Sequence, residues 1–148
     1  MSTVLPESFL QCMNPSDRKS LGKAGLTASE AQKKWQRGEE RKIHDTVIQW
    51  LRLRKIPFIH ARMDKPSTIG VGWPDVTVIY RGRALCLELK APGGRLSEEQ
   101  TDTLQTLEAN GTPCKVAYSD AEALSWLRLM IDAIGESAAS IDDKSGCV

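Results

Sequence analysis

One stretch of the sequence, from Gly72 to Lys90, restricts the fold of this chain more than any other. It contains two runs of β-branched and apolar residues, Val76–Tyr80 and Ala84–Leu89, which Arg81-Gly82-Arg83 connects. Two such runs joined by a short glycine-containing connector predict an antiparallel β-hairpin. The chain is therefore expected to contain a β-sheet that includes this hairpin.

The charged residues of this stretch gather at the open end of the predicted hairpin. With a turn about Gly82, Asp75 falls opposite Leu89 to within one position, and therefore beside Glu88 and Lys90. Side chains alternate along a strand, so two sets should lie on opposite faces of the sheet: Cys86, Glu88 and Lys90 on one, Leu85, Leu87 and Leu89 on the other. Two carboxylates and one ammonium group thus converge at the end of an otherwise apolar sheet.

This combination of side chains suits metal-assisted hydrolysis. Hard divalent cations such as Mg²⁺ take one or two protein carboxylates together with water and substrate phosphate oxygens. Carboxylates held close together repel one another, and a bound cation removes that penalty. A neighbouring lysine such as Lys90 can orient the attacking water, which the metal acidifies.

The same residues resemble the motif of the PD-(D/E)XK nuclease superfamily, and within it the VRR-NUC branch (virus-type replication-repair nucleases). The match consists of Pro74-Asp75, then Glu88-Leu89-Lys90, with Gly72 before them and the segment APGGRLSEEQ from Ala91 to Gln100 after them. The short motif alone is a loose pattern, and its continuation makes the resemblance fairly specific. The resemblance covers residues 40–127, most of a single domain.

The resemblance implies a Mg²⁺- or Mn²⁺-dependent DNA endonuclease that acts on branched DNA, such as Holliday junctions or flaps, in replication, recombination or repair. Asp75 and Glu88 would then hold the metal, together with the Leu89 carbonyl and an acidic residue on the preceding helix. Lys90 would steer the water. The glutamine at position 100 would belong to the site and face the metal or the DNA.

The helical acidic residue that matches the family is Glu40. It precedes Ile43, Val47 and Leu51 with helical spacing and therefore points with the apolar side of the helix. An inward glutamate is costly unless it is paired or bound to metal. Glu39 is the competing choice, and a carboxylate favoured by the helix dipole is the simpler explanation of either residue.

Several polar residues are further candidates with alternative explanations. Gln100 can equally serve as the capping-box partner of Ser97, in which case we expect its side chain to do one job at a time. His44 stands where the family often has glutamine, so its role is open. The candidates for substrate contact are His60, Arg62, Lys65 and Arg95.

The charge distribution favours contact with phosphates, although the total charge does not. The net charge of the 148 residues is +1. Between Lys33 and Arg95 there are 14 Lys and Arg against 6 Asp and Glu, a net charge of +8, whereas the rest of the chain carries 6 against 13. The segment with the candidate site is therefore basic, as contact with nucleic acid requires. Solvated surface charge is the ordinary alternative.

The pattern along the chain predicts a mixed β-sheet flanked by helices, which is the restriction-endonuclease-like α/β core of the family. We expect an irregular arm over residues 1–28, a nuclease domain over 29–134 and a disordered tail over 135–148. Ser29 and Gln32 fit a capping box, Gly38 is expected to interrupt the helix, and the main helix should run from Glu39 or Glu40 to Arg54. The remaining elements should be a strand over residues 56–61, a loop over 64–72, a helix over 97–110, a strand over 113–118 and a last helix from 119.

Other totals bound the cellular setting and the competing functions. No apolar run approaches a membrane span, no signal peptide is visible, and the four cysteines are scattered, which predicts a cytoplasmic protein with free thiols. A viral or mobile-element origin fits the family branch. So small a domain suits a branched substrate better as a homodimer. The alternatives are a non-catalytic DNA-binding module with a nuclease fold, and a coincidental Asp/Glu/Lys network.

Overall fold

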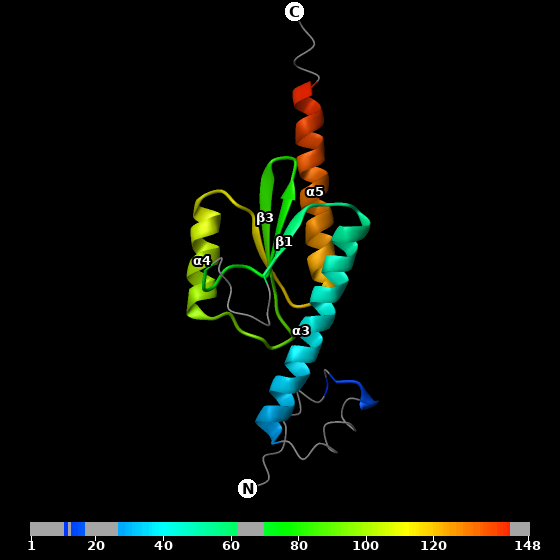
Figure 1. Cartoon of the computed structure of the whole chain (residues 1–148), viewed down its shortest axis with the longest axis vertical. Helices are drawn as coiled ribbons and strands as arrows, with labels where there is room; N and C mark the ends of the chain where they lie inside the picture. The colour runs from blue at the N-terminus through cyan, green and yellow to red at the C-terminus, as the bar shows by residue number, and fades with distance from the viewer. Residues whose placement is uncertain (1–10, 12, 17–26, 62–69, 143–148) are drawn as a thin grey trace, which may run out of the picture.

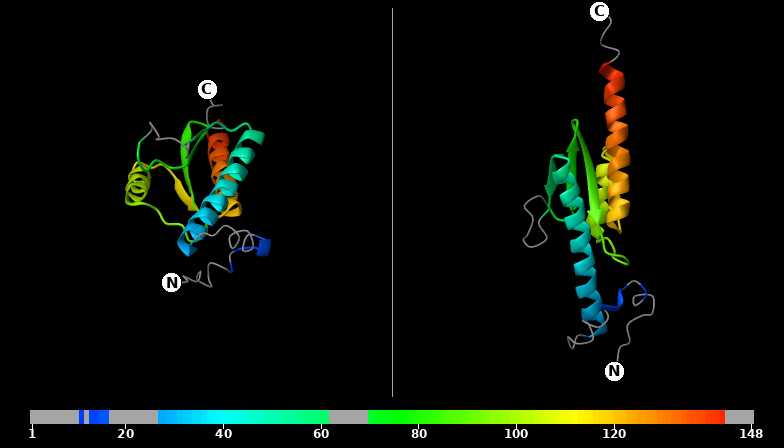
Figure 2. Two further views of the ribbon diagram at one scale, coloured as in Figure 1. Left: turned by 60° about the horizontal axis from the view of Figure 1, so that its bottom comes forward. Right: turned by 90° about the vertical axis from the view of Figure 1, so that its right-hand side faces the viewer.

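The structure is a computed structural model, and it describes residues 11, 13–16, 27–61 and 70–142. The sheet contains four strands in the order β1-β2-β3-β4, with two antiparallel pairings followed by one parallel pairing. The strands and the helices that flank them are α3 (Ala28–Leu53), β1 (Phe58–His60), β2 (Val76–Tyr80), β3 (Arg83–Leu89), α4 (Glu98–Ala109), β4 (Cys114–Ala117) and α5 (Asp120–Asp142). Helix α4 lies on one face of the sheet, and α3 and α5 lie on the other (Figures 1 and 2). The predicted mixed sheet flanked by helices is confirmed.

The hairpin forms as predicted but with a tighter turn. Val76 pairs with Leu87, and Tyr80 pairs with Arg83, so the loop has two residues rather than three. Arg81 and Gly82 both adopt positive φ, 46° and 75°, as a two-residue hairpin turn compatible with strand twist requires. Arg83 therefore belongs to β3, and the register shifts by one position from the predicted one.

The predicted alternation along β3 is confirmed. Leu85, Leu87 and Leu89 face α3 and α5 in the hydrophobic core, while Cys86 and Glu88 are buried under the opposite face. Each fully buried leucine contributes roughly 1.5–3 kcal/mol to folding. The core side chains come from every element on that side, chiefly Ile43, Val47, Leu51, Val76, Val78, Leu85, Leu87, Leu89, Ala123 and Leu127.

Helix α3 begins earlier than predicted and has no break. Its N-cap is Thr27 rather than Ser29: the Thr27 hydroxyl accepts from the Glu30 N–H, and the Glu30 carboxylate accepts from the Thr27 N–H. The helix continues through Gly38, because a single glycine costs only about 1 kcal/mol in a helix. Burial of Ala31 and Trp35 extends its apolar side beyond the glycine.

The other elements differ from prediction mainly in length. The first strand is limited to Phe58–His60, and the Pro57 carbonyl accepts from the Ile79 N–H at its start. Helix α5 continues past Gly135 to Asp142, into the segment predicted as a disordered tail. Most of the loop predicted over 64–72 falls within residues 62–69, outside the described part of the chain. None of the described helices is long and apolar enough to cross a lipid bilayer.

Candidate active site

Asp75 and Glu88 come together where β2 begins and β3 ends. Asp75 directly precedes β2, and its Oδ2 accepts a hydrogen bond from the Leu89 N–H at 2.8 Å. Continuing the hairpin register by one residue places Asp75 opposite Glu88. The hairpin therefore carries Asp75 to the end of the neighbouring strand, although the two residues are 13 positions apart in the sequence.

Glu88 is the most unusual residue of this region. Its side chain is only 1% exposed, and its Oε1 atom accepts from Lys90 Nζ at 2.9 Å and from Gln100 Nε2 at 2.5 Å. Its Oε2 atom is buried and has no hydrogen-bond partner among the described residues. Burial, reinforced by the charge of Asp75 and opposed by Lys90, raises the pKa of Glu88 to about 7 from its ordinary 4.5. One oxygen of this buried carboxylate therefore has two donors, and the other has none among the described residues.

Gln100 does both of the jobs that the sequence left as alternatives. Its Oε1 accepts from the Ser97 N–H at 3.0 Å in the capping box of α4, while its Nε2 donates to Glu88. The prediction that the side chain could do only one job at a time is wrong. An amide has an acceptor at one end and donors at the other, so it can cap the helix and bind a carboxylate together. Helix α4 therefore fixes the orientation of Glu88.

The structure distinguishes between the two helical glutamates by their contacts. Glu39 pairs with Lys42 on the surface at 2.6 Å. Glu40 is half-buried, and its Oε1 accepts from the Ala91 N–H at 3.3 Å, two residues after the end of β3. Glu40 is therefore the helical carboxylate that reaches the strand end where Glu88 lies.

The two histidines contact each other, a pairing that the sequence did not predict. His44 Nδ1 lies 3.0 Å from His60 Nε2, and His44 Nε2 lies 3.6 Å from Asp75 Oδ2. Burial lowers the pKa of His44. The charge of Asp75 opposes this shift, and His60 reinforces it. The only signal in the sequence was the position of His44 one turn after Glu40. The pairing of strands in the sheet brings His60 on β1 to His44, and no local pattern in the sequence indicates this contact.

The remaining predicted residues are less closely placed. Arg95 is exposed in the turn before α4, and Arg62 and Lys65 lie outside the described residues. Within the described part of the chain, no three His, Cys, Asp or Glu side chains form a group that could hold a metal ion. The acidic oxygens at the strand ends are instead partly engaged by hydrogen bonds from Lys90, Gln100 and the backbone.

Gly72 is a supporting residue whose reason becomes visible only in the structure. Its φ is +81°, and a Cβ atom there would overlap the Glu99 carbonyl and approach the Gln100 nitrogen to 3.0 Å. The segment before Asp75 therefore packs directly on the first turn of α4. A glycine is needed here for close approach as well as for its φ.

Replacing Gly72 by alanine should loosen this packing and the Glu88–Gln100 contact with it. We expect Gly72→Ala to lower the free energy of unfolding by about 1–3 kcal/mol more than Gly111→Ala, measured by urea denaturation. Gly111 is the matched control because its φ is +83° and a Cβ there would meet no atom within 4 Å. Equal losses in the two variants would show that the contact with α4 is unimportant.

Comparison with known proteins gives one match. The family model described as VRR-NUC domain matches residues 17–121, a span that contains α3, the whole sheet and α4. No curated protein and no solved structure matches the chain significantly. The matched span includes every described residue of the candidate active site.

Proposed function

Because the chain belongs to the VRR-NUC domain family, a family of nuclease domains, we propose that it is a metal-dependent endonuclease that hydrolyses phosphodiester bonds in DNA. The observation that carries this proposal is the buried Oε2 atom of Glu88, which lies beside Asp75 and Lys90 and has no hydrogen-bond partner in the described part of the chain. A buried carboxylate oxygen without a donor is costly in a purely structural network. A bound cation accounts for it.

The donor atoms of this region fit a hard divalent cation. Asp75 and Glu88 would hold Mg²⁺ or Mn²⁺, with Glu40 and the Leu89 carbonyl as further oxygen donors. Only one or two protein carboxylates are needed, because water and substrate oxygens complete the coordination of Mg²⁺. When bound, such an ion neutralises charge on the phosphate and acidifies a water molecule. Asp75 directly precedes β2, whereas Glu88 and Leu89 lie on β3 and Glu40 lies on α3.

The neighbouring side chains would prepare the carboxylates and the water. Gln100 holds Glu88 Oε1 from the rigid first turn of α4, so that Oε2 stays free. Lys90 lies 2.9 Å from Glu88 and carries the only ammonium group within ion-pair distance of it among the described residues. In the proposed reaction Lys90 orients the attacking water. His44 faces Asp75 from α3, with Nε2 at 3.6 Å from Asp75 Oδ2 and no hydrogen bond between them.

The substrate class proposed here is branched DNA, such as a Holliday junction or a flap, processed in replication, recombination or repair. The excess of positive charge between Lys33 and Arg95 would provide the phosphate contacts, with His60, Arg62, Lys65 and Arg95 as candidates. A homodimer would present two sites to one branched molecule.

A cleavage panel tests the proposal. Purified protein is incubated with single-stranded, duplex, flap and four-way DNA in Mg²⁺, in Mn²⁺ and in chelator. We expect metal-dependent cutting that is fastest on a branched substrate. Binding without cleavage in either metal would contradict the enzyme and favour a DNA-binding module.

Metal binding can be measured separately from cleavage by calorimetry with Mn²⁺. We expect one site per chain in the wild type and loss of that site in Asp75→Asn, with retention in Asp45→Asn. Asp45 is a suitable control because it is an exposed carboxylate on the same helix as Glu40. If the wild type bound no Mn²⁺, the acidic cluster would be an ordinary ion-pair network and the proposed metal site would be wrong.

A further inference from the structure

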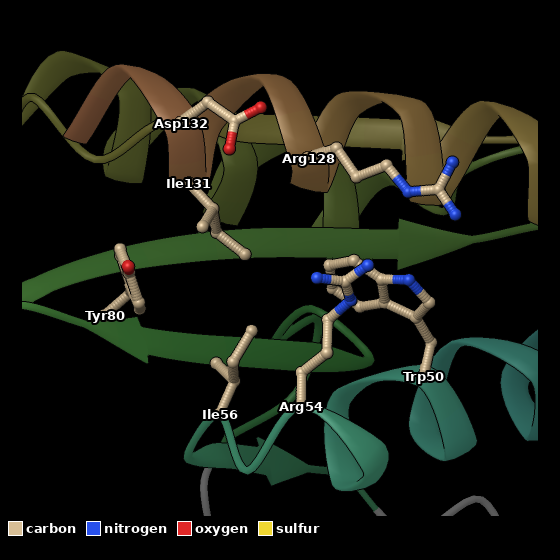
Figure 3. A pocket seen from close by; sticks show the side chains of 7 residues that line it. All are labelled: Trp50, Arg54, Ile56, Tyr80, Arg128, Ile131 and Asp132. Carbon is tan, nitrogen blue, oxygen red and sulfur yellow. The ribbon is translucent and has the colours of Figure 1, made fainter. Parts of the chain in front are cut away.

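A pocket lies away from the candidate active site, between α3, α5 and the turn end of the β2–β3 hairpin. Its volume is about 190 Å³, and Figure 3 shows the side chains that line it: Trp50, Arg54, Ile56, Tyr80, Arg128, Ile131 and Asp132. Tyr80 ends β2 and Asp75 precedes it, so at about 3.4 Å per residue the two ends are about 17 Å apart. The pocket also opens on the side of the sheet that α3 and α5 cover, opposite to Glu88.

Two guanidinium groups and one indole N–H converge in this pocket. The Arg54 guanidinium stacks on the Trp50 ring at 4.5 Å from its centroid, and that of Arg128 lies 5.9 Å from the same centroid. Figure 3 shows the indole nitrogen on the side of the ring that faces Arg128. These groups come from α3 and α5, so the tertiary packing brings them together.

The donors of the pocket are not satisfied within the described part of the chain. Trp50 Nε1 is buried and has no hydrogen-bond partner in residues 27–61 or 70–142 or in the few described residues before them. No ion pair joins Arg54 or Arg128 to a described carboxylate. Asp132 follows Arg128 by one turn of α5, but Figure 3 shows the Arg128 side chain extending away from it. An arginine can stack on a tryptophan ring without any hydrogen bond from the indole N–H. Stacking therefore does not explain why this N–H is buried beside two arginines that have no described ion-pair partner.

We propose that this pocket binds a phosphate group, and that the phosphate belongs to the backbone of a nucleic acid strand. Trp50 Nε1, Arg54 and Arg128 would donate to its oxygens, since guanidinium groups form strong charge-assisted hydrogen bonds with phosphate. The volume is well below the roughly 300–1,000 Å³ of a pocket that encloses a whole small molecule, and it suits a single anionic group. The assignment to nucleic acid rests on the proposed function.

The pocket would then hold the substrate at a distance from the cut. About 17 Å corresponds to about five nucleotides along a strand, so a DNA segment that contacts both places extends beyond the scissile bond. A duplex arm or a second arm of a branched molecule satisfies this requirement, whereas a dinucleotide does not.

The indole N–H resonance of Trp50 reports occupancy directly. The metal-free, ¹⁵N-labelled protein has four indole signals, and Trp50→Phe identifies the relevant one. Inorganic phosphate and a short duplex DNA are titrated in separate arms. We expect the Trp50 signal to shift saturably with both, and at lower concentration with DNA. No shift in either arm overturns the site, and a shift with phosphate alone overturns the assignment to nucleic acid.

Variants connect the signal to the two arginines. Arg128→Gln and Arg54→Gln should each remove most of the shift, while Arg52→Gln, with the same charge change on exposed α3 surface outside the pocket, should leave it. Arg128→Gln should also reduce the slope of log affinity for DNA against log salt by about one. Retention of both shift and slope in Arg128→Gln would contradict the proposal. These measurements need no metal, so they are independent of cleavage. A Trp50 signal that responds in a protein that cuts no DNA would contradict the proposed nuclease activity and still support the phosphate site.

Discussion

Asp75→Asn should reduce the rate of DNA cleavage by about a thousandfold or more while the protein stays folded. A metal-bound phosphate gains several kcal/mol of transition-state stabilisation, and each 1.4 kcal/mol corresponds to a factor of ten in rate. The amide of asparagine keeps an oxygen that can accept from the Leu89 N–H, so the strand end should hold its geometry. The substitution removes only the negative charge that would bind the cation.

The measurement is single-turnover cleavage of a branched substrate at saturating Mg²⁺, together with thermal unfolding of the same samples. Lys90→Ala should show a similar loss of cleavage, since its ammonium group lies at Glu88. Asp45→Asn supplies the control for loss of one exposed carboxylate from the chain. Wild-type rates in purified Asp75→Asn or Lys90→Ala would remove the basis of the assignment.

Glu88→Gln should stabilise the metal-free protein above pH 7, although it should abolish cleavage. In the folded wild type the pKa of Glu88 is raised from 4.5 to about 7 because the carboxyl is buried beside Asp75. Below pH 4.5 the group is protonated in the folded and the unfolded chain. Between pH 4.5 and 7 the folded chain keeps this proton while the unfolded chain loses it. The free energy of unfolding therefore falls as the pH rises through this range, and the stability that depends on the protonated carboxyl is lost above pH 7.

The variant cannot ionise and therefore escapes this loss. We expect its free energy of unfolding at pH 8.5 in chelator to exceed that of the wild type by on the order of 1–3 kcal/mol, with the difference vanishing near pH 4.5. Urea denaturation across that range measures it. Added Mn²⁺ should raise the unfolding temperature of the wild type and not that of Glu88→Gln. A wild type that is more stable than the variant at pH 8.5 in chelator would mean that the buried carboxylate is fully compensated by Lys90 and Gln100.

The local pattern predicted the elements that contain the site, with errors at their ends. The two apolar runs around Gly82 predicted the hairpin, and the observed register falls within the one position that the prediction left open. Turn type, and not composition, decides whether Arg83 belongs to the loop. The start of α3 was misplaced from Thr27 to Ser29, since two capping boxes overlap there. Gly38 did not break the helix, because burial of Trp35 outweighs the weak preference of one glycine.

The residues that converge at the site were named from the sequence, but their contacts were not. Spacing alone could not separate Glu39 from Glu40. The hydrogen bond from the Ala91 N–H, two residues beyond the end of β3, makes the difference. The double role of Gln100 depends on where α4 crosses the sheet. The contact between His44 and His60 depends on β1 lying at the edge beside β2.

The residue pattern was enough to predict the mixed sheet, the alternation that buries Leu87 and Glu88 on opposite faces, and the identity of the charged residues at the hairpin's open end. These follow from periods of two and 3.6 residues, which short-range geometry imposes. No pattern in the sequence indicates that Glu88 Oε2 lacks a hydrogen-bond partner among the described residues, or that Arg54 and Arg128 meet at Trp50. Both results depend on how separate elements pack, and the free energy of packing is shared among residues that no local pattern connects.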